Sequence, residues 1–400
     1  MPQRNKRKRA KRTVQTSLKP IFATLIPVTM KVLFQTRTNL FDAPGGDMIQ
    51  LLKTKEHLEK LGVEVDVSLE FEPDLSKYDL VHLFNLMEPQ DIYLQMLNAK
   101  KQNKKIALST IYGLYTEFER KARGGLFQQL ANVISPYQIA YIKTAVKQYY
   151  ENRFHKGVFK MLYKGYYGLM KEIVDNTAIF LPNSVSEMNR VAAEFKLKNY
   201  TFADIPNAID KTVFSDGDKN KFNQFSQYQD CILCAARIEG RKETLNLVRA
   251  VKDTNYKLVL VGKESKNQKK YVEKVHEEAG DNVVFLGAIP HDNLKELYKV
   301  AKVHALVSWM ETPGLSSLEA AAMGCNIVVT RKGDTYDYFE DDAFYCEPDD
   351  VNSIKTALDN AFSSPVNPKL KAKIFDNYTW EKTAEETYKA YQKIVNITIN

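Results

Sequence analysis

The most informative part of the sequence is VSWMETPGLSSLEAAAMG, residues 307–324. The apolar run over 303–307 predicts a buried strand, and the Pro-Gly pair predicts a turn that leads into a helix from about Ser316 to Met323. A turn that feeds a helix start presents unpaired backbone N–H groups and the positive end of the helix dipole. This stretch therefore suits an anion such as a phosphate.

Two glutamates frame the expected turn. Glu311 lies before it, and Glu319 lies in the first turn of the helix. Carboxylates in such places can accept hydrogen bonds from sugar hydroxyls, as acidic residues do for ribose in other nucleotide sites. However, Ser316 and Glu319 also have the spacing of a capping box, and capping alone would explain Glu319. Both interpretations stay open at this point.

The wider segment resembles the nucleotide-sugar signature of retaining GT-B glycosyltransferases, family 4 (glycosyl transferases group 1). Several features recur in order: the two glutamates with Gly314 between them, the EAAAMG run, and an apolar strand over 327–329. The resemblance covers about 30–395. It is strong over 230–330 and weak over 110–175.

The resemblance implies an α/β fold of the GT-B type, with two Rossmann-like, doubly wound domains that face each other across a cleft. Strand and helix patterns alternate along the chain in agreement with this. In chain order we expect a basic extension over 1–29, an N-terminal acceptor-side domain over 30–205, a linker over 206–229, a nucleotide-sugar-binding domain over 230–378, and a helix over 379–400 that crosses back to the first domain.

The segment 112–175 interrupts the regular alternation. Within it, basic and aromatic residues are interleaved at helical spacing over 137–174, a pattern typical of a membrane-surface or acceptor-facing element. An ordinary solvated basic face with its aromatics in the core would give the same pattern. Stacking of single-stranded nucleic acid is a third interpretation, but no other feature of the sequence supports it.

The charge of the chain is uneven. Its formal net charge is +8, and residues 1–29 hold eight basic residues and no acidic ones, so that 30–400 is neutral. The body is therefore not a general nucleic-acid binder. Residues 1–29, which we expect to be disordered, could be an inefficient signal, a membrane-surface arm or a nucleic-acid tail. Alternatively, Met30 is the true start, because it opens the first expected strand.

Cysteine use and acidic pairs give no support for a metal site. The chain has four cysteines, which imply no disulfide framework and fit a reducing cytoplasm. Cys231 and Cys234 have CxxC spacing, but they lie in an apolar run without a second pair nearby, so we interpret them as buried thiols. Asp216 and Asp218 form the DxD pattern that holds a metal in another glycosyltransferase fold, but their polar setting indicates a solvated loop. No metal or other cofactor is expected.

Arg237 and Lys242 follow the first expected strand of the second domain. Two cations five positions apart at a strand-to-helix turn can converge on one diphosphate, where Arg offers a planar fork and Lys a point charge. Arg241 competes with Lys242 for this role. The spacing matches the Arg-x4-Lys of the family, which implies that Arg237, Lys242 and Glu311 are the catalytic residues. Glu311 would lie near the transferred sugar.

The resemblance also implies donor-binding residues at the ends of strands. Gly45 and Gly46 form the glycine loop after the first strand, which by itself is weak evidence and lacks a dinucleotide fingerprint. The full set of implied donor-binding residues is Gly45, Gly46, Gly262, Gly287, Gly314, Leu315 and Glu319. Of these, Glu319 would hold the ribose hydroxyls.

The acceptor side departs from the family. Many members have a His after the fourth strand, near the sugar, and here Tyr112 stands at or beside that position. Possible acceptor-side residues are Tyr112, His82 and Glu117, although His82 better matches a structural His of its strand. The acceptor site is therefore expected to differ from that of the family.

The implied function is transfer of a sugar from a nucleotide-sugar donor to a hydroxyl of a saccharide or lipid-linked acceptor, with retention of anomeric configuration. Cell-surface polysaccharide or glycolipid biosynthesis would be the setting. The expected location is the cytoplasm, with association at the inner face of the membrane, and no nucleic-acid partner is expected. The alternatives are a non-catalytic nucleotide-sugar-binding protein of the same fold and a nucleotide-sugar epimerase.

Overall fold

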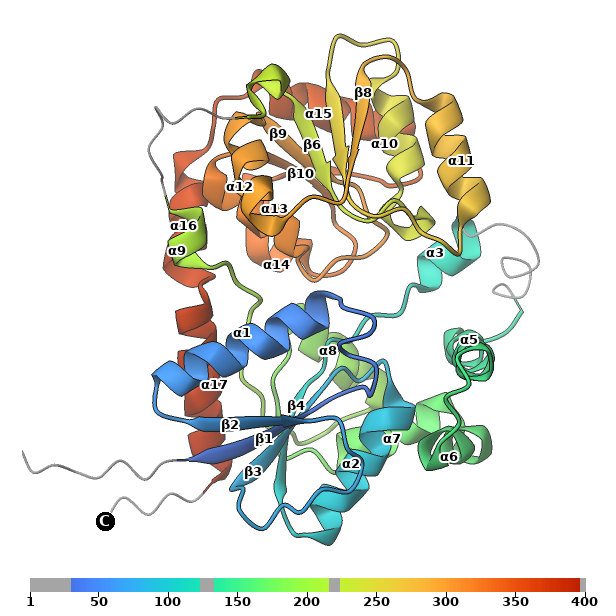
Figure 1. Ribbon diagram of the computed structural model, residues 1–400, viewed down its shortest axis with the longest axis vertical. Helices are drawn as coiled ribbons and strands as arrows, with labels where there is room; N and C mark the ends of the chain where they lie inside the picture. Colours follow the sequence, from blue (N-terminus) through green and yellow to red (C-terminus); the bar gives the residue numbers. More distant parts are fainter. Residues whose placement is uncertain (1–29, 123–132, 216–223, 396–400) are drawn as a thin grey trace, which may run out of the picture.

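The computed structural model describes residues 30–122, 133–215 and 224–395. These ranges form two α/β domains, which lie one above the other in Figure 1. The strands of the first domain are β1 (Lys31–Gln35), β2 (Glu64–Ser68), β3 (Leu80–Phe84), β4 (Lys105–Ser109) and β5 (Ile179–Phe180). Those of the second domain are β6 (Ile232–Ala235), β7 (Leu258–Val261), β8 (Val283–Gly287), β9 (Val303–Leu306), β10 (Asn326–Thr330) and β11 (Phe344–Cys346).

The first sheet has the strand order β2-β1-β3-β4-β5, and the second has the order β11-β10-β9-β6-β7-β8. Every strand pair within the described ranges is parallel. Central strands such as β7, whose sequence is LVLV, are buried throughout, because helices cover both faces of a parallel sheet. The prediction of two Rossmann-like domains is confirmed.

Helices of the first domain cover both faces of its sheet. Leu51 and Leu58 on one helix share a buried cluster with the C-terminal part of the chain, whereas Ile92, Ile173 and Val191 lie in the cluster on the other face. The helices are α1 (Gly46–Lys60), α2 (Pro89–Lys101), α3 (Thr116–Lys121), α5 (Pro136–Tyr150), α6 (Lys156–Lys164), α7 (Tyr166–Asp175) and α8 (Val185–Phe195).

The second domain repeats this arrangement, with a separate hydrophobic cluster on each face of its sheet. Short 3₁₀ helices lie at Ser226–Tyr228, Gly240–Lys242 and Glu340–Asp342. The α-helices are α9 (Lys211–Phe214), α10 (Thr244–Val251), α11 (Lys269–Glu278), α12 (His291–Val300), α13 (Leu315–Met323), α14 (Thr335–Phe339), α15 (Val351–Ser363), α16 (Pro368–Asn377) and α17 (Trp380–Ile394).

Helix α17 crosses back to the first domain, as expected, and runs beside its sheet in Figure 1. Ala384, Ala390 and Tyr391 are buried in the core that includes β1. The helix begins at Trp380, and Thr379 before it caps the helix and forms a parallel bridge with Ile209 of the interdomain stretch. Both ends of the second domain are therefore attached to the first.

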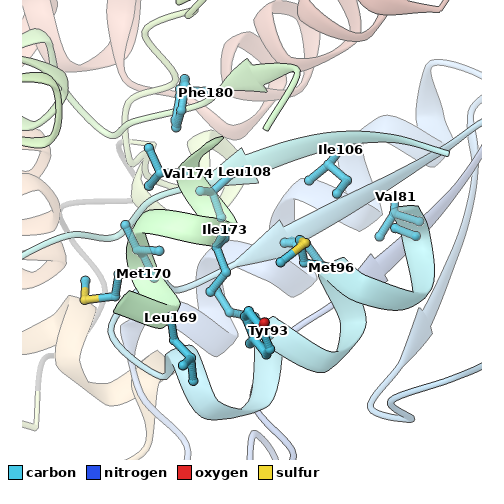
Figure 2. Close-up of a cluster of buried hydrophobic side chains, with 14 of the residues drawn as sticks. Val81, Tyr93, Met96, Ile106, Leu108, Leu169, Met170, Ile173, Val174 and Phe180 are labelled. Atoms are coloured by element: carbon cyan, nitrogen blue, oxygen red, sulfur yellow. The ribbon is translucent and has the colours of Figure 1, made fainter. Parts of the chain in front are cut away.

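The segment 112–175 divides into two parts in the structure. Figure 2 shows Leu169, Met170, Ile173 and Val174 of α7 packed over the first sheet, so this helix is core. Helices α5 and α6 lie outside it at the edge of the domain (Figure 1). The interpretation of the aromatics as core residues therefore holds for α7 but not for the whole segment.

Polar contacts join the two domains. Arg190 of α8 pairs with the buried Asp334, and the Ser186 Oγ donates to Asp337 at 2.7 Å. The Nδ2 of Asn207 donates to the backbone oxygen of Thr312 at 3.0 Å. These contacts fix the edge of the first sheet opposite the second. The predicted extension over 1–29 and the DxD pattern at 216–218 lie outside the described residues.

Candidate active site

Both sheets have a point where the strand order reverses. In the first sheet this point lies between β1 and β3, and in the second it lies between β6 and β9. Ligands of open parallel sheets bind outside the carboxyl ends of the strands at such points. The loops that follow β1, β6 and β9 carry the glycine loop, the two cations and the stretch around Glu311. Topology alone therefore brings these three segments to the cleft.

One cavity lies between the two edges and has about 1750 Å³ of empty space, part of it open solvent. It brings together most of the predicted catalytic and donor-binding residues: Gly45, Gly46, Arg237, Lys242, Glu311, Gly314 and Leu315. It is also lined by residues that the sequence analysis did not assign, including Arg37, Asn85, Tyr115, Asn207 and Met310.

Three cations from the loop after β6 line this cavity: Arg237, Arg241 and Lys242. Arg237 is exposed, and it has no ion pair within the described part of the chain, so its guanidinium can bind an anion. Lys242 is mostly buried and pairs with Glu311. Burial lowers the pKa of Lys242, but the charge of Glu311, its hydrogen bond to Lys242 and the nearby Tyr115 together outweigh this effect, and the pKa is raised. Lys242 therefore stays charged in the cavity.

The backbone of Glu311 is held by the loop after β10. Its N–H donates to the Lys332 carbonyl at 3.2 Å, and its own carbonyl accepts from Asp334 N–H at 2.8 Å. Gly333 allows this approach, because a Cβ there would lie 2.2 Å from the Glu311 oxygen. With its backbone held on both sides and its carboxylate paired to Lys242, Glu311 has a defined position in the cavity.

Helix α13 presents its N-terminus to the same cavity. Its N-cap is Gly314, no side chain caps it, and a Cβ at Gly314 would lie 2.7 Å from Leu306. The helix starts at Leu315, so Ser316 lies inside it and cannot be the N-cap. The capping-box interpretation of Glu319 is therefore wrong. The uncapped N–H groups are available to an anionic ligand.

Glu319 instead bonds to α12. Its Oε1 lies 2.8 Å from His291 Nε2, and its Oε2 accepts from the Tyr298 hydroxyl at 3.1 Å. The hydrogen bond to Glu319 raises the pKa of His291 against the opposing effect of burial. Glu319 does not line the cavity described above, so its expected role at a ribose stays a prediction.

Gly262 directly follows β7 and Gly287 ends β8, and neither lines the cavity. A Cβ at Gly262 would lie 1.9 Å from the carbonyl oxygen of Ala236, so only glycine allows this strand end to approach the loop that carries Arg237. Gly287 has φ of +65° and accepts from the Gly262 N–H at 2.8 Å. The structure therefore gives both glycines a role in loop packing, and their contact with a donor stays a prediction.

Arg37 organises the glycine loop, and the sequence analysis did not identify it. Its guanidinium donates through all three nitrogens: Nε and Nη2 to the two carboxylate oxygens of Asp47, Nη1 to Asn39, and Nη2 to the Ala43 carbonyl. Asn85, which follows β3, donates to the same Asp47 at 3.0 Å. Arg37 is thus fully used in holding the loop. The sequence feature that could have identified Arg37 is the presence of an Arg and an Asp, Arg37 and Asp47, on either side of the Gly-Gly pair.

Segment 113–121 crosses from the first domain to the second. The Arg241 Nη1 donates to the Tyr115 hydroxyl at 3.2 Å, and the guanidinium lies over the tyrosine ring. Farther along, Phe118 packs near Trp309 with ring centroids 6.3 Å apart. Figure 1 shows α3 reaching the second domain. Arg241 therefore makes a cross-domain contact, whereas Lys242 pairs with Glu311, and both line the cavity, so the assignment of Lys242 to a diphosphate stays a prediction.

Two of the residues proposed for the acceptor side are enclosed in the core. His82 is 1% exposed, with Nδ1 2.6 Å from the Tyr391 hydroxyl and Nε2 2.9 Å from the Ser109 hydroxyl. Burial holds its pKa well below 6.5, so the ring is neutral. Tyr112 is buried against Phe195, its hydroxyl lies 2.7 Å from that of Tyr137, and burial raises its pKa to about 12. Neither side chain lines the cavity, so the structure gives no support for their acceptor roles, which stay predictions.

Glu117, the third proposed residue, lies on α3. It pairs with Lys121 of its own helix and with Lys332 of the second domain at 3.0 Å. These salt bridges lower the pKa of Glu117, against the opposing effect of burial. Its side chain joins the domains and does not line the cavity, so the structure offers no support for a contact with the acceptor.

The cysteines lie where the sequence analysis expects them, inside the second domain. Cys231, Cys234, Cys325 and Cys346 are buried free thiols. Burial raises the pKa of Cys234 to about 12, so it stays protonated. Within the described ranges, no group of three or more His, Cys, Asp or Glu side chains could hold a metal ion. The same ranges contain no helix with the length and apolar character needed to span a bilayer.

Comparisons with known proteins agree with this arrangement. Residues 216–379 match the model of a family described as glycosyl transferases group 1. An uncharacterized glycosyltransferase of Methanocaldococcus jannaschii is 30% identical over 174 residues, which are 40% of this chain and 44% of that protein. A D-inositol 3-phosphate glycosyltransferase of Stackebrandtia nassauensis is 26% identical over 244 residues, 55% of each chain. The chain spans about half the length of the curated relatives it matches.

Solved structures are similar over nearly the whole chain. Sucrose-phosphate synthase from Thermosynechococcus elongatus has a TM-score of 0.68 at 15% identity and covers 91% of this chain and 99% of its own. Anabaena HepE in complex with UDP-glucose has a TM-score of 0.61 at 14% identity and covers 91% of this chain and 100% of its own. These similarities show the fold alone. The chain therefore has the GT-B fold, and its residues 216–379 match the glycosyl transferases group 1 family.

Proposed function

We propose that this protein is a retaining glycosyltransferase of family 4, which moves a sugar from a nucleotide-sugar donor to a hydroxyl group of an acceptor. The observation that carries the proposal is the convergence of Arg237, Lys242, Glu311 and the uncapped start of α13 on one cavity. Cations and a helix start suit the diphosphate of a donor. The opposing Gly45-Gly46 loop permits close approach of the ligand to backbone.

The names of the similar proteins support this proposal. Three kinds of curated relative carry glycosyltransferase names, among them a phosphatidylinositol N-acetylglucosaminyltransferase subunit from Arabidopsis thaliana, which is 24% identical over 197 residues. Anabaena HepE was crystallised with UDP and with UDP-glucose. We therefore expect a nucleoside diphosphate sugar as the donor here.

The proposed reaction breaks the bond between the anomeric carbon and the diphosphate and forms a bond to the acceptor oxygen, whose proton is released. Negative charge develops on the departing diphosphate. We expect Arg237, Lys242 and the backbone N–H groups at the start of α13 to stabilise that charge, which is the effect that contributes most to many enzymatic rates. We expect Glu311, which pairs with Lys242, to lie near the carbon where positive character develops. No step of this scheme requires a metal ion.

The acceptor is proposed to be a saccharide or lipid-linked sugar in cell-surface polysaccharide or glycolipid biosynthesis, at the inner face of a membrane. The relative whose name includes phosphatidylinositol supports a lipid-linked acceptor. A non-catalytic nucleotide-sugar-binding protein would have the same donor contacts without turnover. The experiment below distinguishes it from an enzyme.

The test combines binding with turnover. A thermal-shift screen against UDP-, GDP- and ADP-sugars identifies the donor, because a ligand that binds the native state raises the midpoint of unfolding. Donor hydrolysis is then measured in wild type, in Arg237→Ala and in Arg249→Ala. Arg249 is a matched control, since it pairs with Glu278 on α10 and α11 and does not line the cavity.

We expect stabilisation by one donor class, turnover by wild type and by Arg249→Ala, and a loss of about a hundredfold or more in Arg237→Ala. Stabilisation without turnover, with or without acceptor saccharides, would favour the binding protein. If no nucleotide sugar stabilised the protein, the assignment of this cavity as a donor site would be wrong.

A further inference from the structure

The outer face of α5 and α6 exposes an unusual number of large apolar side chains. Four of them are more than half exposed: Tyr149 at 69%, Tyr150 at 82%, Phe159 at 60% and Tyr163 at 88%. Exposed single apolar residues are common, but a contiguous group marks an interaction site. We call this group the aromatic face, and its members are Ile142, Val146, Tyr149, Tyr150, Phe154, Phe159, Leu162 and Tyr163.

Ring contacts show that the aromatic face is continuous from one helix to the next. Tyr149 packs against Tyr150 with ring centroids 5.8 Å apart and against Phe154 at 6.3 Å. Phe154 in turn lies 6.3 Å from Phe159 of α6. On α5, the members at 142, 146, 149 and 150 have the spacing of one side of a helix. The aromatic face is therefore formed by side chains that pack on one another along the two helices, and not by a frayed helix end.

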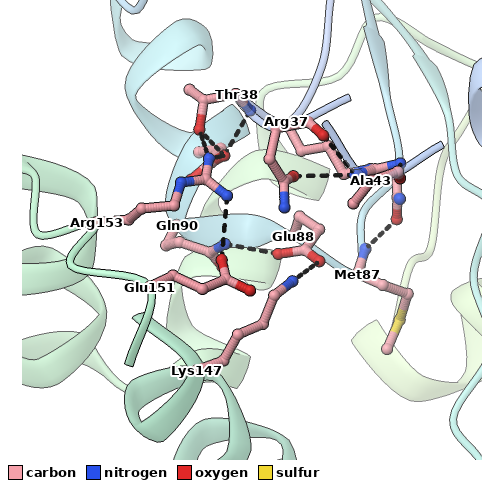
Figure 3. Close-up of polar contacts among 12 residues, drawn as sticks. Arg37, Thr38, Ala43, Met87, Glu88, Gln90, Lys147, Glu151 and Arg153 are labelled. Carbon is pink, nitrogen blue, oxygen red and sulfur yellow. Dashed lines mark hydrogen bonds and ion pairs between the residues drawn. The ribbon is translucent and has the colours of Figure 1, made fainter. Parts of the chain in front are cut away.

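The other side of these helices is anchored in the first domain. Val158 and Met161 of α6 are buried, and a Cβ at Gly157 would lie 1.8 Å from the backbone oxygen of Gln90, so α6 lies tightly on the start of α2. Figure 3 shows Lys147 and Arg153 of the same region bonded to Glu88 and Thr38. Each helix thus has one apolar side packed against the first domain and a second apolar side exposed to solvent.

Cations border the aromatic face. Lys156, Lys160 and Lys164 are exposed along α6. Lys164 pairs with Glu172, whereas Lys156 and Lys160 form no ion pair with the described residues. Glu151, the acidic residue next to the aromatic face, is paired with Arg153. The region therefore presents positive charge together with exposed aromatic rings.

We propose that the aromatic face docks the protein on the surface of an anionic lipid bilayer. Interfacial helices combine Lys on the polar side with Phe and Leu on the buried side, and Tyr favours the level of the headgroups. Protein–protein interface cores are depleted of Lys, so the unpaired Lys156 and Lys160 favour lipid over a protein partner. Anionic headgroups complement both lysines.

Docking in this orientation brings the membrane surface to the acceptor side. A second cavity, with about 600 Å³ of empty space, is lined by Pro136, Ile139 and Ala140 of α5. It shares Met87, Gly113 and Tyr115 with the candidate active site. A lipid-linked acceptor could therefore reach the cleft from the membrane beside α5. This last step rests on the proposed function, whereas docking itself does not.

The test measures cosedimentation of the full chain with vesicles of phosphatidylcholine and phosphatidylglycerol, and with phosphatidylcholine alone. Every protein carries glutamine at the eight basic positions of 1–29, so that this segment cannot supply the binding. The variant replaces Tyr150, Phe159 and Tyr163 by Ser. A matched control replaces three exposed apolar residues elsewhere, Leu61, Tyr200 and Val366, by Ser. Equal thermal midpoints of the proteins confirm that each remains folded.

We expect binding to the anionic vesicles that weakens on the order of tenfold or more in the variant and not in the control. Lys156→Gln and Lys160→Gln should each weaken it by about fivefold. Equal binding by variant and control overturns the proposal. So does self-association of the starting protein that the variant abolishes, because the aromatic face would then be an interface between copies. Donor hydrolysis in solution should be the same in all three proteins, which separates failure of docking from failure of the proposed function.

Discussion

The residues proposed for the donor side and those proposed for the acceptor side lie in different surroundings in this molecule. On the donor side, Arg237, Lys242, Glu311 and Gly314 all line one cavity, as expected from their positions after β6 and β9. On the acceptor side, neither His82 nor Tyr112 faces the cavity. The difference teaches that topology brings the loops at the ends of parallel strands to the cleft, whereas packing decides whether a side chain such as His82 of β3 or Tyr112 after β4 is buried in the core.

Four predictions test this comparison, from the largest expected effect to the smallest. The first concerns the loop after β1, which lies opposite the donor residues. Arg37→Ala should lower the free energy of unfolding by about 3–5 kcal/mol, because it leaves the carboxylate of Asp47 buried without its partner. Denaturant unfolding measures this. The matched control is Arg153→Ala, whose side chain is more exposed, at 23%. Equal losses in both variants would contradict the role of Arg37 in the loop.

The second prediction concerns the buried pair in the cavity. Lys242→Met should lower kcat/KM for donor turnover by about 10²–10³-fold, which is the effect of removing one preorganised charge-stabilising donor. Lys332→Met is the control, because Lys332 also pairs with a glutamate, Glu117 of the first domain, but does not line the cavity. Similar losses in the two variants would mean that the effect comes from the loss of any such ion pair. Donor turnover would then no longer support the assignment of Lys242.

The third prediction separates the two glutamates. Glu319→Gln should mainly raise the donor KM by roughly ten- to a hundredfold, because a hydrogen bond to a charged group contributes about 1.5–3 kcal/mol. Glu311→Gln should lower kcat more than it raises KM, because it acts nearer the reacting carbon. Steady-state kinetics of both variants measure this. The reverse pattern would show that the roles of the two glutamates are exchanged. Wild-type kinetics for both variants would show that neither glutamate contributes to donor binding or turnover.

The smallest effect is expected for metal removal. Donor turnover should be unchanged by EDTA, because the charge of the diphosphate is met by Arg237, Lys242 and the start of α13. Turnover rates before and after chelation measure this. Abolition by EDTA with rescue by Mn²⁺ or Mg²⁺ would contradict the prediction and would direct attention to Asp216 and Asp218.

Helix α13 shows why even the donor side was only partly predictable. The sequence placed a helix after the turn, and the structure has it, but the start lies at Leu315 with Gly314 as N-cap. The N-cap therefore lies two residues before Ser316, and Ser316 lies within the helix. Helix ends are set by local backbone conformation, here φ of +85° at Gly314, which the sequence pattern locates only approximately.

Segment 112–175 shows what could not be predicted. Basic and aromatic residues alternate throughout it, yet α7 is core and α5 and α6 carry an exposed aromatic face. The pattern shows that these helices have apolar sides but not which side meets the sheet. Gly157 is an example, because its closeness to Gln90 depends on residues far apart in the chain.

The sequence by itself determined the two parallel sheets and the loops that meet at the cleft, because alternation of strand and helix and the strand ends follow local rules. Only the tertiary structure decided that Lys242 pairs with Glu311, that Arg37 holds the glycine loop, and that Tyr112 turns into the core. These depend on which side chains meet across long separations in sequence. Packing and burial set such contacts, and no local pattern records them.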